Sequence, residues 1–350
     1  MANKHRSPKR IEQEGQQTIW NPVDIAIGEA IQKMVSPDNI NTVPKTVQNS
    51  VVTTDAVTSL WKNAQSFIDF ERTGDEKKLA KGRKSVSNVA KITLAEDVLE
   101  KAAPLGEFQR AVLEAVISEL AAGNMAWSSS MLYRTMVGKT NGESVTPEQQ
   151  KLVDDAMSTL MYTPLHIDLR DFIPECDDLK QGEVILDGPI LPAERLKMTI
   201  SGTSVAAYRI TGVPIILRFC SAARSITMTP IGLLDIDMNY TQRTIALLNA
   251  MQRYIAPLIY PPVGQYKKPR PLLIPYASLY SVAFEGSDAD DTFTLRKRVR
   301  ENVHAILDTW ASRGYIASWD TLKEGRSYVA VRVHFPNTQP RRMETLHLDS

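Results

Sequence analysis

A cluster of basic side chains near residue 297 is the strongest chemical signal in the sequence. Four cations and two further polar residues gather within nine positions: Arg296, Lys297, Arg298, Arg300, Glu301 and His304. Cationic side chains neutralise backbone phosphates, arginine can bind guanine through two hydrogen bonds, and glutamate can accept a hydrogen bond from cytosine. We therefore predict that this segment contacts double-stranded DNA. The alternative is a solvated helix face that happens to be basic.

The cluster is expected to lie on a helix, because apolar residues recur at helical spacing through the same segment. The apolar positions of residues 292–312 step by three or four and define one buried face: Leu295, Val299, Val303, Ile306 and Trp310. With that face buried, Lys297, Arg300, Glu301 and His304 point outward. Residues near the start of such a helix contact base edges in the major groove.

A hairpin is expected after this helix. Residues 315–319 and 328–335 alternate between apolar and polar side chains, as strands do. A turn at residues 323–326 would place two further cations, Lys323 and Arg326, where they reach phosphate or the minor groove. The second strand should direct four side chains into the core: Val329, Val331, Val333 and Phe335.

The same order of elements occurs twice. Residues 240–254 and 275–284 have helical patterns, so the C-terminal region has three helices and a hairpin, an order typical of a winged-helix domain. An earlier region repeats it, with expected helices at 105–124, 128–138 and 146–161 and expected strands at 165–169 and 182–186. The repetition supports both assignments.

Charge separates the two predicted units. Residues 91–190 contain seventeen acidic and eight basic side chains, whereas residues 295–342 contain ten basic and four acidic ones. Because phosphate neutralisation supplies most non-specific DNA affinity, the second unit should bind DNA and the first should be repelled by it. The first unit is therefore expected to bind a partner.

A chain of 350 residues is long enough for about two domains. We predict the α+β class, with two tandem winged-helix domains behind a polar, partly disordered N-terminal arm. The arm should contain an amphipathic helix at 54–72 and a basic cluster at 77–84 that either touches phosphate or is simply solvated. The expected bounds are an arm at 1–90, an acidic first domain at 91–225, a basic second domain at 226–340 and a tail at 341–350.

On these residues the chain resembles the tandem winged-helix replication initiators of iteron-containing plasmids, over roughly residues 91–336. The resemblance rests on the paired units, the run from Leu295 to Val303, the Gly314-Tyr315-Ile316 segment and the strand at 328–335. It implies a C-terminal domain that reads origin repeats and an N-terminal domain that serves dimerisation and secondary DNA contact. The resemblance also implies that the protein recruits host replication proteins and represses its own promoter. The long N-terminal arm and the proline-rich insertion at 257–275 depart from the family pattern.

Signals for catalysis are weak. Gly138-Lys139-Thr140 looks like the end of a phosphate-binding loop, but Tyr133 stands where that loop requires glycine. Asp235 and Asp237 could hold magnesium, although Asp237 and Asn239 also fit as caps of the following helix. The five histidines contain no pair spaced by one residue, and no Gly-x-Ser-x-Gly motif occurs. We predict no catalytic residues, no metal site and no cofactor.

The expected compartment is the bacterial cytoplasm, in association with the nucleoid or a plasmid. Two cysteines, Cys176 and Cys220, cannot form a disulfide framework or a paired-cysteine zinc site. The basic start of the chain is followed by polar residues, so no secretory signal is expected. The most apolar stretch, residues 205–220, is interrupted by charges and is too short to span a bilayer, so no membrane partner is expected.

The leading hypothesis is a sequence-specific DNA-binding protein that binds origin repeats of a plasmid or mobile element and recruits replication proteins. The second is a winged-helix transcriptional regulator that binds an operator. The third is a non-enzymatic adaptor or structural protein of a phage or mobile element, whose basic helix meets protein or RNA. Tandem direct repeats beside an AT-rich segment would indicate an origin, and one inverted repeat at a promoter would indicate a regulator.

Overall fold

The structure, a computed structural model, describes residues 50–54, 91–93, 106–139, 144–168, 185–200, 203–214, 217, 226–261, 266–284 and 292–340. The expected arm helix beyond Thr54, the basic cluster at 77–84, both cysteines and the C-terminal tail lie outside these residues. The described elements combine helices with small antiparallel sheets, so the predicted α+β class is confirmed.

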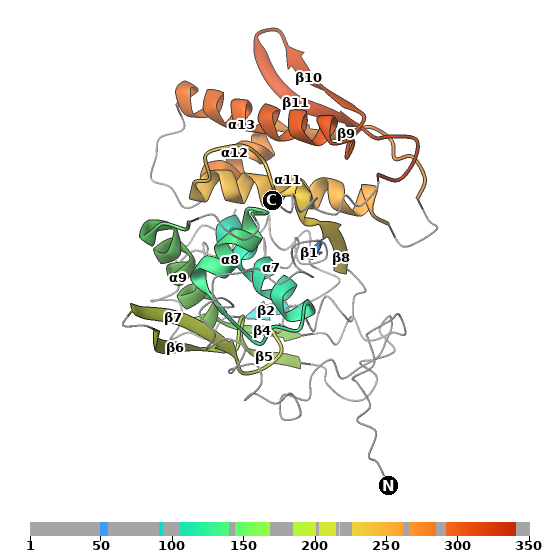
Figure 1. Cartoon of the computed structure of the whole chain (residues 1–350). Coiled ribbons are helices and arrows are strands. Elements are labelled where there is room, and N and C mark those ends of the chain that lie inside the picture. The colour runs from blue at the N-terminus through green and yellow to red at the C-terminus, as the bar shows by residue number, and fades with distance from the viewer. Residues whose placement is uncertain are drawn as a thin grey trace, which may run out of the picture.

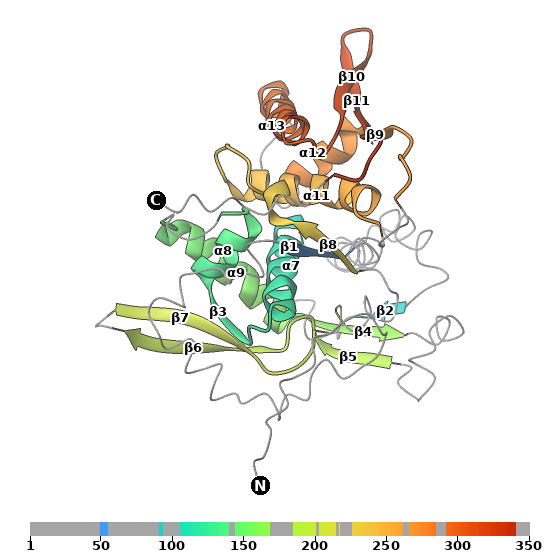
Figure 2. The same cartoon turned by 45° about the vertical axis from the view of Figure 1, so that its right-hand side comes forward.

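The first unit packs helices above a three-stranded sheet (Figures 1 and 2). Strand β7 lies between β3 and β6 and runs antiparallel to both. Along the chain these elements follow the order helix, strand, helix, helix, hairpin, with two strands of another sheet inserted before the hairpin. The elements are α7 (Glu107–Ala121), β3 (Ala126–Ser128), α8 (Ser129–Met136), α9 (Pro147–Tyr162), β6 (Ala193–Ile200) and β7 (Thr203–Ile210).

The helix ends in this unit follow from side chains that prefer helix termini. Ser128 caps α8, because its hydroxyl accepts a hydrogen bond from the Met131 amide at 3.2 Å. Thr146 and Gln149 form a capping box at the start of α9. After α7, Gly123 has a φ of 89°, a left-handed conformation that glycine adopts without strain. The structure thus contains the three helices expected in this unit.

The hairpin of the first unit is not the one predicted. The strand expected at 165–169 corresponds to β4 (Pro164–Asp168), and the one expected at 182–186 overlaps β5 (Ile185–Pro189) at residues 185 and 186 only. β4 pairs with β5 and with β2 (Lys91–Thr93), in a sheet separate from that of β3. The hairpin that joins β3 is β6–β7, which had no predicted strand. Alternation along a strand indicates which face is buried, but it does not identify the strand that pairs with it.

The second unit repeats the order of the first. Strand β11 lies between β9 and β10, as β7 lies between β3 and β6. The elements are α11 (Gln242–Ile259), β9 (Leu272–Pro275), α12 (Tyr276–Phe284), α13 (Phe293–Ser312), β10 (Ser318–Glu324) and β11 (Ser327–His334). The apolar face predicted for α13 is buried at Val299, Val303, Ile306 and Trp310, whereas Leu295 in the first turn is only half-buried.

The C-terminal hairpin contains a β-bulge. The strands pair Leu322 with Ala330 and Lys323 with Tyr328, which leaves Val329 as the extra residue. Val329, expected in the core, is 38% exposed. The prediction was wrong here because it assumed an unbroken ladder. The other three residues expected in the core are buried: Val331, Val333 and Phe335.

Two predictions about the segment before α12 are wrong. Asp237 and Asn239 do not cap α11, because Thr241 occupies that position and its hydroxyl accepts from the Thr244 amide at 3.3 Å. The two ends of the expected proline-rich insertion belong to the unit, since Pro257 lies inside α11 and Leu272–Pro275 form β9, which pairs with β11.

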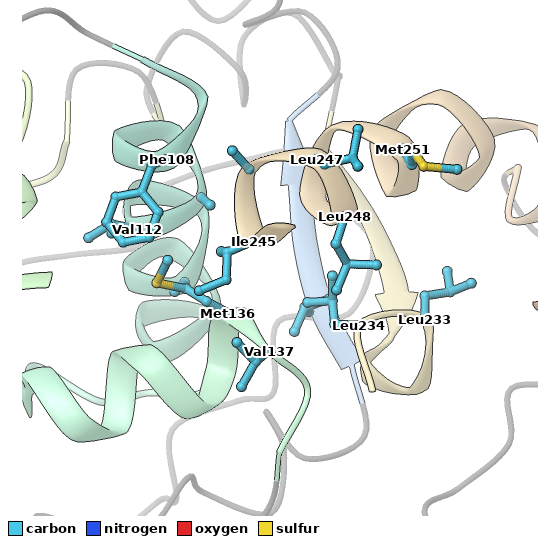
Figure 3. Packing of buried hydrophobic residues seen from close by; sticks show 14 of the residues in the cluster. Phe108, Val112, Met136, Val137, Leu233, Leu234, Ile245, Leu247, Leu248 and Met251 are labelled. Atoms are coloured by element: carbon cyan, nitrogen blue, oxygen red, sulfur yellow. The ribbon is translucent and has the colours of Figure 1, made fainter. Parts of the chain in front are cut away.

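The two units share one buried core. α7 packs against α11, and Figure 3 shows side chains from both helices, with those of α8, in the same cluster. Strand β1 (Ser50–Thr54) pairs with β8 (Ile226–Pro230) beside these helices, and Val51 is 3% exposed. The domain boundary expected near residue 225 stays a prediction.

Buried charges cross the interface between α7 and α11. Arg253 donates a hydrogen bond to Glu114 at 3.0 Å and pairs with Glu107, and Arg110 lies 3.5 Å from Glu114. Burial by itself lowers the pKa of Arg253, but the two carboxylates outweigh burial and raise that pKa above its usual value. The guanidinium therefore stays charged, and its stability in the core depends on its partners.

Glu119 on α7 is a buried carboxyl whose ionisation opposes folding. It accepts hydrogen bonds from Thr135 Oγ1 at 2.7 Å and Asn124 Nδ2 at 2.8 Å. These bonds lower its pKa, but burial outweighs them and raises the pKa from 4.5 to about 7. Between these values the folded protein binds the proton more tightly than the unfolded chain does, so stability should fall as the pH rises. We expect a decrease of about 3 kcal/mol from this group.

The variant Glu119→Gln should remove most of this pH dependence, because an amide does not ionise. Urea unfolding of both proteins between pH 4.5 and pH 7.5 measures the effect. At low pH the two free energies of unfolding should be similar, and near neutral pH the variant should be the more stable. A pH dependence that is equally steep in the variant would show that Glu119 is not its source.

Candidate nucleic-acid interface

The basic helix α13 and the hairpin β10–β11 lie at the end of the molecule opposite the first unit's sheets (Figure 1). The hydroxyl of Thr292 caps α13, which begins at Phe293. In its first two turns, Arg296, Lys297 and Arg298 are exposed. This is the part of a recognition helix that reaches base edges in the major groove.

The outer face of α13 carries a solvated ion pair. Lys297 Nζ lies 3.8 Å from Glu301 Oε1, and the two side chains are 62% and 60% exposed. A pair of this kind contributes little to stability. Both groups can therefore exchange this contact for a ligand, the ammonium for phosphate or guanine and the carboxylate for cytosine.

Arg300 is held by aromatic side chains instead of projecting into solvent. Its guanidinium donates a hydrogen bond to the Tyr280 hydroxyl at 2.9 Å. The same group lies 4.5 Å from the centroid of the Tyr328 ring. Because Tyr280 is on α12 and Tyr328 is on β11, Arg300 ties the basic helix to both elements.

The Tyr328 ring stands at the centre of these contacts. Lys323, its partner across the hairpin, places Nζ 4.5 Å from the ring centroid, and Tyr276 meets the ring edge-on at 6.0 Å between centroids. Cations over an aromatic face are attracted by the ring quadrupole. The Tyr328 ring therefore contacts one cation of α13, Arg300, and one cation of the hairpin, Lys323.

Replacing Tyr328 by alanine should lower the free energy of unfolding by about 1–2 kcal/mol, since the ring provides two cation–π interactions of about 0.5–1 kcal/mol each. Tyr328→Phe keeps the ring and should be close to the original protein. Urea unfolding of the three proteins measures both effects. An equal decrease in the two variants would mean that the hydroxyl, and not the ring, supports the hairpin.

His304 also joins α13 to its neighbours. Its Nε2 lies 2.9 Å from the Tyr276 hydroxyl, and its ring packs against Trp319 of β10 with centroids 4.7 Å apart. Burial, aided by the charge of Arg300, lowers the pKa of His304 against the opposing effect of nearby carboxylates. At neutral pH the imidazole is therefore mainly uncharged, which suits a packing role and not a phosphate contact.

The tip of the hairpin presents two exposed cations, Lys323 and Arg326. Between them, Gly325 has a φ of 59°, a backbone conformation that glycine adopts without strain and that allows the tight turn. The turn expected at 323–326 is present but shorter: Gly325 and Arg326 form it, and Lys323 lies near the end of β10.

The eight residues predicted to bind DNA fall into two groups. Two are half-buried and join elements to each other, Arg300 and His304. Six are exposed on α13 or at the hairpin tip: Arg296, Lys297, Arg298, Glu301, Lys323 and Arg326.

Aromatic residues that no sequence prediction includes support this surface. Tyr276, Tyr280 and Phe284 follow each other at four-residue spacing on α12, and their rings stack with centroids 5.8 and 6.2 Å apart. Arg296 lies over the Tyr280 ring at 5.4 Å. The four-residue spacing shows in the sequence that these rings share one face of a helix. The sequence does not show that this face contacts the basic helix, because the contact depends on how α12 and α13 pack.

The corresponding helix of the first unit, α9, has a different chemistry. Its one basic residue, Lys151, is accompanied by three acidic ones on the same helix. Of these, Asp154 is used within the unit, because it accepts from the hydroxyls of Ser129 and Tyr208 and pairs with Arg195 at 3.3 Å. α9 therefore lacks the array of cations that α13 carries.

The other chemical signals of the sequence have structural partners. A Cβ on Gly138 would lie 2.4 Å from the Asp235 amide nitrogen, so this turn packs on backbone. Asp235 itself lies near Lys139 and Arg313, at 3.6 and 3.4 Å. Within the described residues, no three histidine, cysteine, aspartate or glutamate side chains gather as a metal site would require. In the same part of the chain, no helix has the length and apolar character to cross a membrane.

Comparisons with known proteins give a structural similarity but no family. No protein-family model and no curated protein matches the chain. Among solved structures, the crystal structure of RctB domains 2-3 (RctB-155-483) is similar at a TM-score of 0.35 and 7% sequence identity, over 71% of this chain and 91% of that chain. A TM-score this low does not establish a shared fold.

Proposed function

We propose that this protein binds double-stranded DNA in a sequence-specific manner through the second of two tandem winged-helix domains. The exposed cations of α13 beside the hairpin tip carry this proposal. Arg296, Lys297 and Arg298 occupy the start of the helix, and Lys323 and Arg326 occupy the tip. A helix in the major groove with a hairpin on the adjacent backbone would use both sets of cations.

Preorganisation of this surface supports the proposal. The hairpin is attached to α13 through Arg300, His304 and Tyr328, so its cations need little ordering when DNA binds. Binding then costs less conformational entropy, and more of the contact energy appears as affinity. The charge contrast between the units supports the assignment to the second one.

In its most specific form, the proposal is a non-enzymatic replication initiator of a plasmid or mobile element. It would bind origin repeats and recruit host replication proteins, and the first domain would mediate a homodimer. The initiator family that the sequence resembles has two such domains in tandem, and the repeated order of elements in this chain supports that resemblance. No cofactor and no membrane takes part, and the protein would act in the cytoplasm on the nucleoid or a plasmid.

Capture of DNA by the full-length protein tests the proposal. Sheared DNA from its own replicon and a random duplex library should be captured at near-physiological salt and sequenced, and affinity should then be followed across a salt series. Enrichment of tandem direct repeats is the result expected for a replication initiator. Enrichment of a single inverted repeat would instead indicate a transcriptional regulator. Uniform capture that salt abolishes would contradict specific binding and favour a protein or RNA partner for the basic helix.

A further inference from the structure

Phe293 is an exposed aromatic side chain at the point where α13 begins. It is 78% exposed, the highest value among the large hydrophobic residues that the structure describes as exposed. The capping hydroxyl of Thr292 fixes the backbone at this position. Phosphate contact by the neighbouring cations does not explain a phenyl ring here.

The ring belongs to the same stripe of α13 as three of the cations. Residues three, four and seven positions apart share a helix face, which groups Phe293 with Arg296, Lys297 and Arg300. The Arg300 guanidinium carbon is 5.9 Å from the centroid of the Phe293 ring. Phe293 is therefore an apolar spot bordered by charge, on the part of the helix that faces DNA in the proposed function.

The apolar group that base pairs present in the major groove is the 5-methyl group of thymine. The remaining groups on the base edges there are hydrogen-bond donors and acceptors, for which a phenyl ring offers no partner. We infer that Phe293 contacts the methyl group of a thymine in the recognised site, an inference that rests on the proposed function.

Helix geometry also fixes where that thymine lies. Side chains three or four residues apart on a helix are about 5–6 Å apart at Cβ. Successive base pairs are about 3.4 Å apart along the DNA axis. The thymine therefore lies within two base pairs of a guanine that Arg296 or Lys297 contacts.

Single replacements of thymine by deoxyuridine test the inference, because they remove only the methyl group. The probe is the site that the full-length protein selects from random duplexes. For the original protein, one replacement within two base pairs of a contacted guanine should weaken binding about fourfold, the equivalent of one buried methyl group at about 0.8 kcal/mol. The guanine is identified by 7-deazaguanine, which lacks the N7 acceptor.

The variant Phe293→Ala should bind the unmodified site at least fourfold more weakly and show no further weakening on the same deoxyuridine replacement. Tyr162→Ala is the matched control, because Tyr162 is 75% exposed on α9 of the other unit. That control should keep both the affinity and the sensitivity to the methyl group.

Two results would overturn the inference in distinguishable ways. If every deoxyuridine replacement affects the original protein and Phe293→Ala equally while a selected site is still bound, the thymine contact fails and the proposed function stands. If no site is selected from random duplexes, the proposed function fails and the thymine contact fails with it.

Discussion

Reversing the charges of Lys297 and Arg298 together is expected to lower the affinity for duplex DNA about 100-fold, because each cation supplies about 1–3 kcal/mol of binding energy. The plot of log affinity against log salt should also become less steep by about one unit for each phosphate that is no longer neutralised. Both side chains are exposed on α13, so the double variant Lys297→Glu with Arg298→Glu should fold normally. Fluorescence anisotropy with a labelled duplex across a salt series measures affinity and slope together.

A matched pair of single variants separates site-specific binding from overall charge. Lys297→Glu and Lys151→Glu make the same chemical change on exposed positions of α13 and α9, so they alter the net charge equally. Only the first should weaken binding substantially. Equal weakening in the two variants would show that DNA responds to the total charge of the protein and would remove the support for α13 as the binding surface.

Replacing Arg253 by methionine is expected to lower the free energy of unfolding by about 3–5 kcal/mol, because Glu107 and Glu114 would be left buried without their main partner. The decrease is a large share of the stability of a typical protein, so the variant should unfold at much lower urea concentration. DNA affinity measured on the folded fraction should change little, since the network joins α7 to α11 and contains none of the exposed cations of α13 or the hairpin tip.

The double variant Arg253→Met, Glu107→Gln is the control for this prediction. It removes one positive and one negative charge and leaves Glu114 beside Arg110 at 3.5 Å, so stability should recover in large part because an unpaired charge costs far more than an absent pair. If the double variant is as unstable as Arg253→Met, the decrease comes from packing around residue 253 and not from an unpaired carboxylate.

Much of the helical structure could be predicted from local sequence, because caps and apolar spacing act over a few residues. Ser128, Thr146 and Thr292 each cap a helix at the expected place. Strand pairing depends on distant segments, so local sequence does not predict the sheet to which β4 and β5 belong. The bulge at Val329 is a property of the paired hairpin and leaves no clear signal in one strand.

The candidate site also has features that local sequence predicts and features that depend on the folded chain. Exposed cations such as Lys297 and Arg326 follow from charge and helical spacing, which the sequence contains. Arg300 of α13 contacts Tyr280 of α12 and Tyr328 of β11. These three elements meet only in the folded chain. The sequence therefore predicts which groups can contact DNA better than it predicts which groups hold them in position.

Hydrogen exchange of the full-length protein, with its selected duplex and with a scrambled duplex of equal composition, tests whether the second unit binds DNA in a sequence-specific manner. The selected duplex should slow exchange in the first turns of α13 and at the tip of the β10–β11 hairpin, and α9 should be unaffected. The scrambled duplex should have a much smaller effect at the same concentration and salt. Equal protection by both duplexes, or protection of α9 in place of α13, would contradict sequence-specific binding through the second unit.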